Sequence, residues 1–486
     1  MASRSPNPHD DPQGLGDDLW ETGPSYMSSN KPLARLVARP VREFLRVEAA
    51  GSLVLLLAAA IALIWANSAW SDSYDAFWHT RVALDAGPLQ LDDTLQHWVN
   101  DALMVIFFFV VGLEIKYELV NGDLRDPRTA ALPIVAAIGG MVVPAAFYVA
   151  FNPPGSGGSA GWGIPMATDI AFAVGVLGVL GRRIPSAARL FLLTLAIVDD
   201  IGAILVIAVF YTADLSLGWL AIAIGLLVAM VVARALRIWT IVVYAVLGVG
   251  VWFALLESGV HATLAGVAIG LLAPAGSLLK EEVARGHARA ALRDNVLDPD
   301  ELTRLRFLLK ESVSVVERLQ STLHPVSAYV VLPVFALANA GVELGAIGQV
   351  FTAPVGLGII AGLVVGKPLG ILAASWIAVR LGLGRLPDRT TWPMVLGLGA
   401  VGGIGFTVSI FIAGLSFPGA DLLTEEAKIA ILLASLLAAA VGVAILLLST
   451  RGGSDERSEQ SEESGASGAA GAAGAAASAE SSRGRS

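Results

Sequence analysis

The chain has 486 residues, of which 55% are hydrophobic and only 15% charged, and its mean hydropathy is +0.70. This composition excludes an ordinary soluble protein and indicates a membrane protein. The lack of cysteine excludes structural disulfides and thiolate metal sites, whereas the formal net charge of −9 excludes little, because many of the acids lie in two polar tails.

The two ends of the chain are polar and poor in large apolar residues. We expect residues 1–30 and 451–486 to be disordered cytoplasmic tails on either side of a transmembrane domain at 31–450. No signal peptide is visible, because the first long apolar run begins near Ala49, after a basic stretch. That run is therefore expected to stay in the protein as a membrane span.

Helix-length apolar runs recur between the tails. A helix needs about 20 mostly apolar residues to cross about 30 Å of hydrocarbon. Alternating strand patterns are rare, which favours an all-α membrane protein over a barrel. We expect about 12 transmembrane helices, near residues 48–66, 95–119, 131–151, 160–180, 187–211, 217–234, 238–255, 258–273, 322–345, 353–379, 392–416 and 426–448. Between the first two, the alternating "RVAL" and "LQLD" around Ala86–Gly87 would allow a β-hairpin.

The charge of the connections predicts the orientation, because cytoplasmic loops carry an excess of Lys and Arg. The stretches before the first span and after spans two, four and six are basic, whereas those after spans one, three and five are acidic or uncharged. Both termini are therefore expected in the cytoplasm. The longest connection, 280–318, has equal numbers of acids and bases and is expected to form a cytoplasmic helical loop.

A few ionisable residues lie within the apolar spans. An acid there costs roughly 2.5 to 3.5 kcal/mol on insertion scales, so each needs a reason. Asp199 and Asp200 lie near the centre of the fifth span. The others are Asp169 in span four, Lys367 in span ten, Glu114 near the inner end of span two, and His261 at the start of span eight.

The adjacent Asp199 and Asp200 predict a shared polar site. They are about 100° apart on a helix, so they would edge one cavity from different angles. Two carboxylates about 5 Å apart at an effective dielectric near 20 repel by about 3 kcal/mol, which favours holding a proton. The same hard oxygens suit Na⁺ or Li⁺, and an entering cation must displace the protons. The pair therefore predicts a site that protons and a small cation occupy in turn.

Two spans are expected to be interrupted. In the fourth, Gly161, Gly163 and Pro165 come just before Thr168 and Asp169, and proline removes a helix donor. The eleventh has five glycines within 397–405. Interrupted spans in separate halves of a chain indicate an inverted-repeat transporter, with spans four and eleven crossing at the midplane. The glycines could instead serve close helix packing alone.

Crossed half-helices leave opposed partial charges inside the membrane. Asp169 suits the positive helix ends and Lys367 the negative ones. Lys367 could instead, or also, pair with Asp199. A purely structural ion pair is the alternative for both Asp169 and Lys367.

Specific motifs occur in order from about Arg42 to Leu448. They include "FFFVVGLEIKYEL", "AAIGGMVVPA", "MATDIAFAVGVL", "LAIVDDIGAI", "SGVHATLAG", "LHPVSAYVVLPVFALANAGV", "GKPLGI" and "GIGFTVSIFIAGLSF". In these the chain resembles the NhaA-type sodium/proton antiporters. The resemblance implies electrogenic exchange of internal Na⁺ or Li⁺ for external H⁺, for pH and sodium homeostasis. It also implies a multi-pass protein in the lipid bilayer of a bacterial-type inner membrane, often as a homodimer.

The resemblance assigns roles to residues by position. Asp200 would be the principal cation ligand, and Asp199 would complete the site, alternating between protonation and a salt bridge to Lys367. Thr168 would lend an oxygen to the transported Na⁺ where the broken helices cross, and Asp169 would balance helix ends. We expect no enzyme activity, no cofactor and no nucleic-acid partner.

Part of the family's pH-response cluster is present. The candidates are Glu114, Glu118, His324 and His261. Tyr117 stands where the family often has Arg, and Gln320 and Ser321 stand where a Glu and a His can precede the histidine of span nine. The family's pH profile is therefore not carried over to this chain. Each candidate also has a structural alternative: a glutamate that faces water, a packing histidine, or a histidine that begins a helix.

The alternative function is a proton-coupled carrier of another small solute. It needs a larger cavity with aromatic or arginine contacts, and no arginine lies in mid-span. A membrane aspartyl protease would need its two acids on facing helices without a balancing lysine, and a passive channel would need a symmetric pore. A structural membrane protein would tolerate the loss of Asp200. The antiporter accounts for more of the singled-out residues than any of these.

Overall fold

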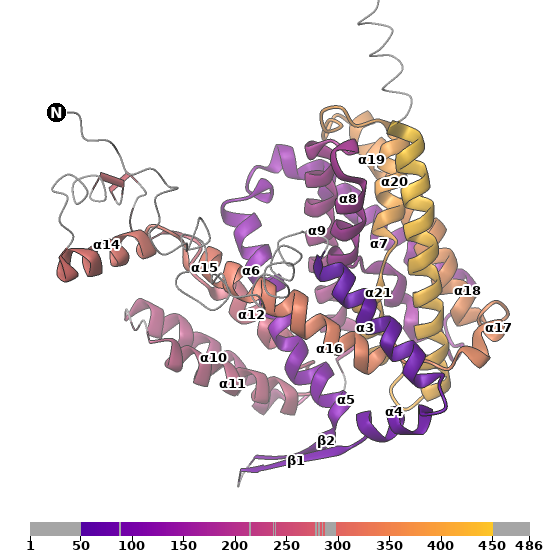
Figure 1. The fold of residues 1–486 in the computed structure, drawn as a ribbon, viewed down its shortest axis with the longest axis horizontal. Coiled ribbons are helices and arrows are strands. Elements are labelled where there is room, and N and C mark those ends of the chain that lie inside the picture. Colours follow the sequence, from indigo (N-terminus) through magenta and orange to yellow (C-terminus); the bar gives the residue numbers. More distant parts are fainter. Residues whose placement is uncertain are drawn as a thin grey trace, which may run out of the picture.

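The computed structural model describes residues 50–450, except residues 87–88, 213–214, 237, 239, 278, 280–281, 284 and 287–297. The tails expected at 1–30 and 451–486, and the basic stretch before the first span, lie outside the described residues. What the structure describes is almost entirely helical (Figure 1).

The elements of the first half follow the expected spans in order. They are α3 (Ala50–Ala66), α4 (Ser71–Trp78), β1 (Arg81–Ala86), β2 (Leu89–Thr94), α5 (Leu95–Trp98), the π-helix η3 (Val99–Leu103), α6 (Met104–Val120), the 3₁₀-helix η4 (Asp123–Arg125), α7 (Pro127–Phe151), the 3₁₀-helix η5 (Ser159–Met166), α8 (Ile170–Leu180), the 3₁₀-helix η6 (Gly181–Arg183) and α9 (Ser186–Phe210).

The second half continues with a further series of helices. They are α10 (Leu217–Ala235), α11 (Ile241–Glu257), α12 (Leu264–Leu272), α14 (Pro299–Glu311), α15 (Val315–Val326), the π-helix η7 (Ser327–Val331), α16 (Leu332–Asn339), the 3₁₀-helix η8 (Leu344–Ala346), α17 (Ile347–Val350), α18 (Pro354–Ala361), the π-helix η9 (Gly362–Gly366), α19 (Lys367–Arg380), α20 (Trp392–Gly402) and α21 (Phe406–Ser416). The last described helix is Asp421–Thr450.

Seven described helices are long and apolar enough to cross a membrane, or up to nine if each of two bent pairs counts as one span. The helices in two of the expected spans, 238–255 and 258–273, are shorter than these bounds. α11 has 17 residues and α12 has nine, whereas a full crossing needs about 20. The helix of the ninth span begins at Val315. This helix therefore includes the last residues of the connection expected at 280–318. The described part of that connection also contains α14.

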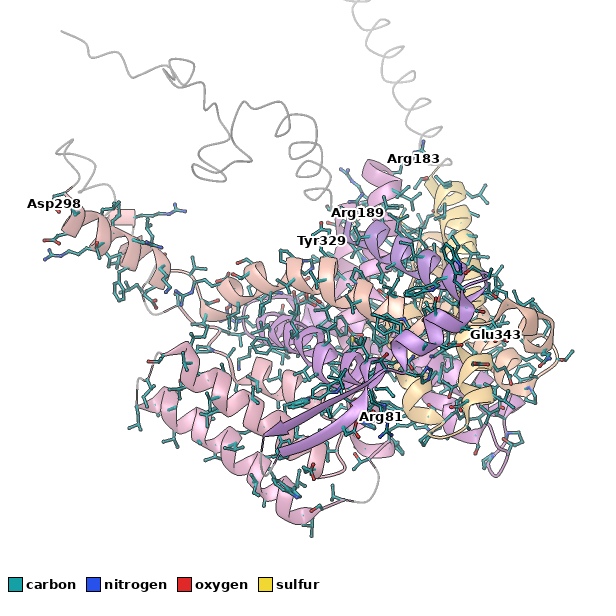
Figure 2. All side chains as sticks on the ribbon, turned by 60° about the horizontal axis from the view of Figure 1, so that its bottom comes forward. Arg81, Arg183, Arg189, Asp298, Tyr329 and Glu343 are labelled. Carbon is teal, nitrogen blue, oxygen red and sulfur yellow. The ribbon has the colours of Figure 1, made fainter. Side chains whose placement is uncertain are left out.

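Two described elements, the strands β1 and β2, are not helical, in contrast to the all-α prediction. β1 and β2 pair in antiparallel register, with Arg81 opposite Thr94 and Ala86 opposite Leu89. This is the hairpin that the alternating sequence allowed. In Figure 1 it projects below α5. Figure 2 shows Arg81 of this hairpin at the opposite end of the helical body from Arg183 and Arg189, which lie in the connection and helix after α8.

The helices form two groups (Figure 1), which meet where α6 contacts α9 and where α16 contacts α21. In the first group α7 packs along α9, α18 and α19, and α19 packs on α20. In the second, α12 and α15 pack along α6, and α11 packs along α10. α3 contacts both groups, through α8 and α16.

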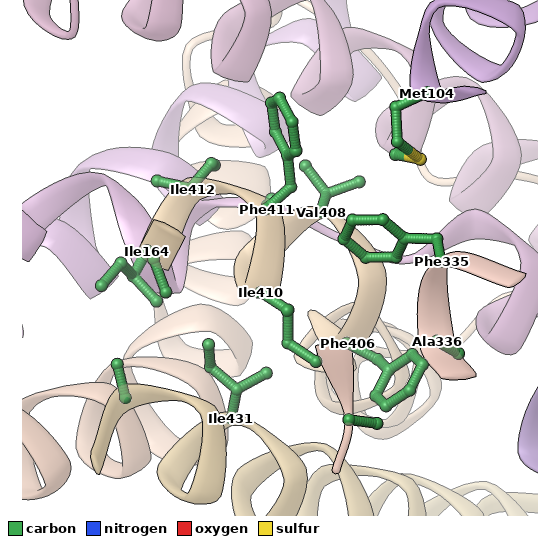
Figure 3. Close-up of a cluster of buried hydrophobic side chains, with 14 of the residues drawn as sticks. Met104, Ile164, Phe335, Ala336, Phe406, Val408, Ile410, Phe411, Ile412 and Ile431 are labelled. Carbon is green, nitrogen blue, oxygen red and sulfur yellow. The ribbon is translucent and has the colours of Figure 1, made fainter. Parts of the chain in front are cut away.

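α21 lies in the middle of the apolar core. Nine of its 11 residues are buried, as expected for a helix that is apolar all round. Figure 3 shows its side chains among Met104 of α6, Phe335 of α16 and Ile431 of the last helix. The ring centroid of Phe411 lies 5.3 Å from that of Phe108 and 6.5 Å from that of Phe335. These aromatic contacts join the two helix groups beside the buried acids.

Close backbone contact between α7 and α19 fixes the position of Lys367, the first residue of α19. A Cβ on Gly370 would lie 2.2 Å from the carbonyl oxygen of Gly139, and a Cβ on Gly139 would lie 2.4 Å from that of Gly370. Only glycine permits such an approach. The π-helix η9 directly precedes Lys367, and wide turns of this kind are frequent at functional sites.

We therefore expect Gly370→Ala to destabilise the protein by about 1–3 kcal/mol, because the added methyl group overpacks two touching backbones. Thermal unfolding of the detergent-solubilised protein would measure the effect. Gly225→Ala in α10 is the matched control, because nothing lies within 4 Å of a Cβ at that position. Equal unfolding temperatures for the two variants would contradict the close contact.

Candidate functional site

The backbone of the fourth and eleventh expected spans departs from helix at the same place in the molecule. Residues 167–169 are not helical and lie between η5 and α8. Residues 403–405 separate α20 from α21, whose axes differ by 49°. The amide of Asp169 donates a hydrogen bond to the carbonyl of Ile404 at 2.7 Å. The two non-helical segments therefore lie against each other.

Asp169 caps two helices at once. Its Oδ1 accepts from the amide of Phe172 at 3.1 Å, so it is the N-cap of α8. Its Oδ2 accepts from the amide of Thr407 at 3.0 Å and from the Thr407 hydroxyl at 2.6 Å, in the first turn of α21. A helix N-terminus carries a partial positive charge, so one buried carboxylate stabilises both ends.

We expect Asp169→Ala to destabilise the protein by about 2–4 kcal/mol, because α8 loses its N-cap, which costs about 1–2 kcal/mol, and the amide and hydroxyl of Thr407 in the first turn of α21 lose their acceptor. Asp169→Asn should retain much of the stability, since asparagine is also an effective N-cap. Thermal unfolding of both variants in detergent would test this. Wild-type stability in the alanine variant would show that neither helix depends on the carboxylate.

Lys367 and Asp199 form a fully buried ion pair. Lys367 Nζ lies 2.6 Å from Asp199 Oδ2, and both side chains have 0% exposure. The same ammonium group donates to the carbonyl of Met166, the last residue of η5. Lys367 therefore neutralises a carboxylate and also a negative helix end, the two partners that the sequence left open.

Thr168 contacts the ion pair from the break in the fourth span. Its Oγ1 lies 2.6 Å from Asp199 Oδ2 and 2.9 Å from the carbonyl oxygen of Gly402, the last residue of α20. The side chain is completely buried. The hydroxyl thus joins the aspartate helix α9 to the end of α20.

Two carboxylate oxygens in the site have no hydrogen-bond partner among the described residues. They are Oδ1 of Asp199 and Oδ1 of Asp200. Asp200 is 5% exposed and borders a small cavity whose other walls are apolar. These walls are formed by Phe107, Phe108, Val111, Ala203, Ile204, Ile207 and Val408. An unpaired buried carboxylate oxygen is costly, so a proton or a cation would be the natural partner.

The described residues contain no cluster of three or more His, Asp or Glu side chains with the arrangement of a metal site.

Two of the candidate pH-response residues, Glu114 and Glu118, lie toward the other end of α6. The side chain of Gln320 of α15 forms a hydrogen bond with Glu114. Glu118 Oε2 accepts from the amide of Asp123 at 3.0 Å and so caps a turn. Tyr117 packs with Leu319 on an apolar cluster. These are the contacts of Glu118 and Tyr117 in the fold, and a part for Glu118 in the pH response stays a prediction.

The two histidines lie apart from the ion pair. His261 precedes α12, and its Nε2 lies 2.8 Å from the carbonyl oxygen of Tyr211 at the end of α9. This contact fits the packing alternative. His324 is exposed in the last turn of α15, so it does not begin a helix. α15 packs along α6, which carries Glu114 and Glu118.

Some residues of the site carry no signal in the sequence beyond their motif. Thr407 binds Asp169 through two hydrogen bonds. Ser409 donates to the carbonyl of Ile164 at 2.8 Å and ties α21 to η5. Both lie in "GIGFTVSIFIAGLSF", where the only sequence signal for them is a hydroxyl side chain near the start of a half-helix.

The protein is helical and apolar, and it buries two adjacent acids, a lysine and two breaks in helices at one place. This is the organisation of a secondary transporter in a membrane. The comparisons with known proteins agree. Residues 42–446 match the family model described as Na⁺/H⁺ antiporter 1.

Curated relatives are similar over the same region. A protein of Sorangium cellulosum named Na(+)/H(+) antiporter NhaA 2 is 47% identical over 441 residues, which cover 88% of this chain and 94% of the relative. A protein of Frankia alni named Na(+)/H(+) antiporter NhaA 3 is 49% identical over 417 residues, or 84% and 89% of the two chains. One of Citrobacter koseri named Na(+)/H(+) antiporter NhaA is 44% identical over 405 residues, or 83% and 96%.

The chain therefore belongs to the NhaA-type sodium/proton antiporter family. This confirms the resemblance drawn from its motifs.

Proposed function

We propose that this protein exchanges internal Na⁺ or Li⁺ for external H⁺, with more than one proton for each cation, so that transport is electrogenic. The observation that carries the proposal is that the Oδ1 atoms of the buried, adjacent Asp199 and Asp200 have no hydrogen-bond partner in the part of the chain that the structure describes. Family membership supports it. Such exchange would serve pH and sodium homeostasis.

Asp200 is the principal cation ligand in this proposal, and Asp199 completes the site. Protons from outside bind the two acids, and the protein turns inward. Na⁺ then takes the carboxylate oxygens and the oxygen of Thr168 and displaces the protons. Asp199 alternates between protonation and its salt bridge to Lys367. Competition for the same oxygens couples the two fluxes.

The proposed architecture has 12 spans with inverted repeats, and spans four and eleven cross at the midplane of the bilayer. Supporting this, residues 167–169 and 403–405 lie against each other. We place the end of the body that carries Arg183 and Arg189 in the cytoplasm, together with both termini, because basic residues favour that side (Figure 2). The membrane is a bacterial-type inner membrane.

The hairpin β1–β2 would then lie on the outer side. Two strands leave unpaired edges, which can pair with a second copy. We propose that the hairpin contributes to a homodimer in the lipid bilayer. The tails 1–30 and 451–486 are proposed to be cytoplasmic and outside the transport domain 31–450.

A carrier of a larger solute is a weaker proposal. The cavity beside Asp200 is small, and its other walls are apolar side chains. An organic solute needs a larger pocket with several polar groups to orient it. A dehydrated cation needs only a few oxygens.

The test is proton movement in inverted membrane vesicles on addition of Na⁺, Li⁺ or K⁺, over the physiological pH range. Na⁺ or Li⁺ should dissipate a preformed proton gradient, and clamping the membrane potential should change the rate. No response to any of the three cations would reject the proposal. A response that is independent of membrane potential would reject the electrogenic part alone.

A further inference from the structure

We propose that α14 lies in the plane of the membrane surface and docks its apolar side on the anionic lipids of the cytoplasmic leaflet. None of the elements from α3 to α21 packs along this helix. Figure 1 shows α14 outside the packed helices, and Figure 2 shows Asp298, just before it, far from the helical body. The inference goes beyond the proposed exchange and rests on the proposed orientation, in which this connection is cytoplasmic.

Leucines gather on one side of α14. Leu302, Leu305 and Leu309 are spaced by three and four residues, so they lie within about 60° around the helix axis. Leu302 is 54% exposed and Leu309 is 46% exposed. These three residues form the leucine stripe of α14. A leucine stripe on an otherwise polar helix with basic residues is typical of helices that lie in a membrane interface.

The charges of α14 are arranged as an anionic surface requires. Arg306 is four residues from Leu302, and Lys310 is four residues from Arg306, so both basic side chains lie along one edge of the leucine stripe. Long basic side chains lay their stems on apolar surface and extend their charge to the head groups. Asp300 and Glu311 lie roughly opposite the stripe. A docked stripe therefore brings the basic edge to the lipids and keeps these two acids away from them.

The C-terminal end of α14 is fixed beside a membrane span. The guanidinium group of Arg318 in α15 donates to the carbonyl of Lys310 at 2.9 Å and to Glu311 Oε1 at 3.2 Å. The amide of Leu279 donates to the carbonyl of Glu311 at 3.1 Å. Only residues 312–314 separate α14 from the helix Val315–Asn339, which is long and apolar enough to cross a membrane.

This joint makes a bilayer the partner within reach. The 13 residues of α14 extend over about 20 Å, and they start from a point fixed at the end of a span. Acyl chains can take the leucine stripe, while anionic head groups attract the basic edge. α15 in turn packs along α6, which carries Glu114 and Glu118. A docked α14 would therefore hold the start of the ninth span at the membrane surface beside these residues.

The experiment uses the full-length protein in nanodiscs of phosphatidylcholine and phosphatidylglycerol, and it measures quenching of a thiol-attached fluorophore by brominated lipids. The chain has no cysteine, so a single introduced cysteine is labelled specifically. We expect strong quenching in Leu309→Cys. Phe307→Cys is the matched control and should be quenched little. Phe307 is 56% exposed, similar to Leu309, but it lies roughly 160° away from Leu309 around the helix axis.

Arg306→Gln in the labelled Leu309→Cys protein tests the basic edge. A basic residue close to an anionic membrane surface contributes about fivefold to binding, so the equilibrium between docked and free α14 should fall about fivefold. Arg304→Gln is the matched control, because Arg304 is also exposed but lies on the side of the acids. In nanodiscs of phosphatidylcholine alone, the effect of Arg306→Gln should disappear.

Equal lipid quenching at positions 307 and 309 would overturn the docking. So would a label at position 309 that neither brominated lipid nor iodide in the water quenches, because a protein surface would then cover the stripe. Quenching that is insensitive to both Arg306→Gln and phosphatidylglycerol would overturn the anionic partner. Both faces of a nanodisc carry lipid, so these results do not depend on orientation. Reaction of Phe307→Cys with an impermeant thiol reagent in intact cells would instead reject the cytoplasmic placement, and vesicle transport reports separately on the proposed exchange.

Discussion

Asp200→Asn is expected to reduce Na⁺-driven proton movement in inverted vesicles to the level of vesicles that lack the protein. Asparagine keeps the shape of aspartate but neither releases a proton nor supplies a charge. A carboxylate about 4 Å from a cation contributes about 4 kcal/mol at an effective dielectric near 20, or about a thousandfold in Na⁺ affinity. Because Asp200 is buried, and its Oδ1 has no partner among the residues that the structure describes, solvent does not replace that contribution.

The comparison requires equal amounts of folded protein in the membrane. Asp72→Asn is a suitable control, because Asp72 is an exposed acid in the first turn of α4, away from the buried pair. Its transport should equal that of the wild type. Unchanged Na⁺-driven proton movement in Asp200→Asn would place the exchange site elsewhere. Equal loss in both variants would mean that the assay reports on surface charge.

The sequence predicted the charged residues of the site because their background is so apolar. Asp199, Asp200 and Lys367 stand out in spans that otherwise contain almost no charge, and burial of a charge demands a partner. The structure places Lys367 against Asp199 and against a helix end. Their roles in exchange stay predictions, whereas membership of the antiporter family is confirmed.

The neutral part of the site could not be predicted in the same way. Lys367 and Thr168 bind the backbone carbonyls of Met166 and Gly402. Every residue has such a carbonyl, so no side-chain pattern marks these two as partners. Thr407 looks like any threonine in an apolar helix. Their contacts arise only where two chain breaks distant in sequence meet, and a single sequence does not report that distance.

Helix lengths show a similar limit. Apolar runs predict that a segment is buried, but they do not show where the backbone stops being helical. The eighth expected span begins at 258, whereas α12 begins at Leu264. The residues before it form turns, with His261 bonded to the end of α9. The mean hydropathy of a segment depends on its residues alone, so it is the same whether the segment forms a helix or turns.

Lys367→Met is expected to cause the largest loss of stability among single substitutions in the site. Removing one partner of a buried ion pair costs about 3–5 kcal/mol, because the other charge is left buried without compensation. Asp199 would be that charge, at 0% exposure and with Oδ1 already unpartnered. Thermal unfolding in detergent measures the loss. Lys310→Met, on the exposed side of α14, controls for the loss of a lysine as such.

The double variant Asp199→Asn with Lys367→Met should recover most of that loss, since replacing both partners of a buried pair is often close to neutral. A deficit of about 1–3 kcal/mol should persist, because the carbonyl of Met166 loses its donor. If the two single losses simply add in the double variant, the residues do not interact in the resting protein. Recovery of stability without recovery of transport would separate two properties of the pair. It would show that the fold tolerates the joint loss of the two charges, whereas exchange requires at least one of the two charged side chains.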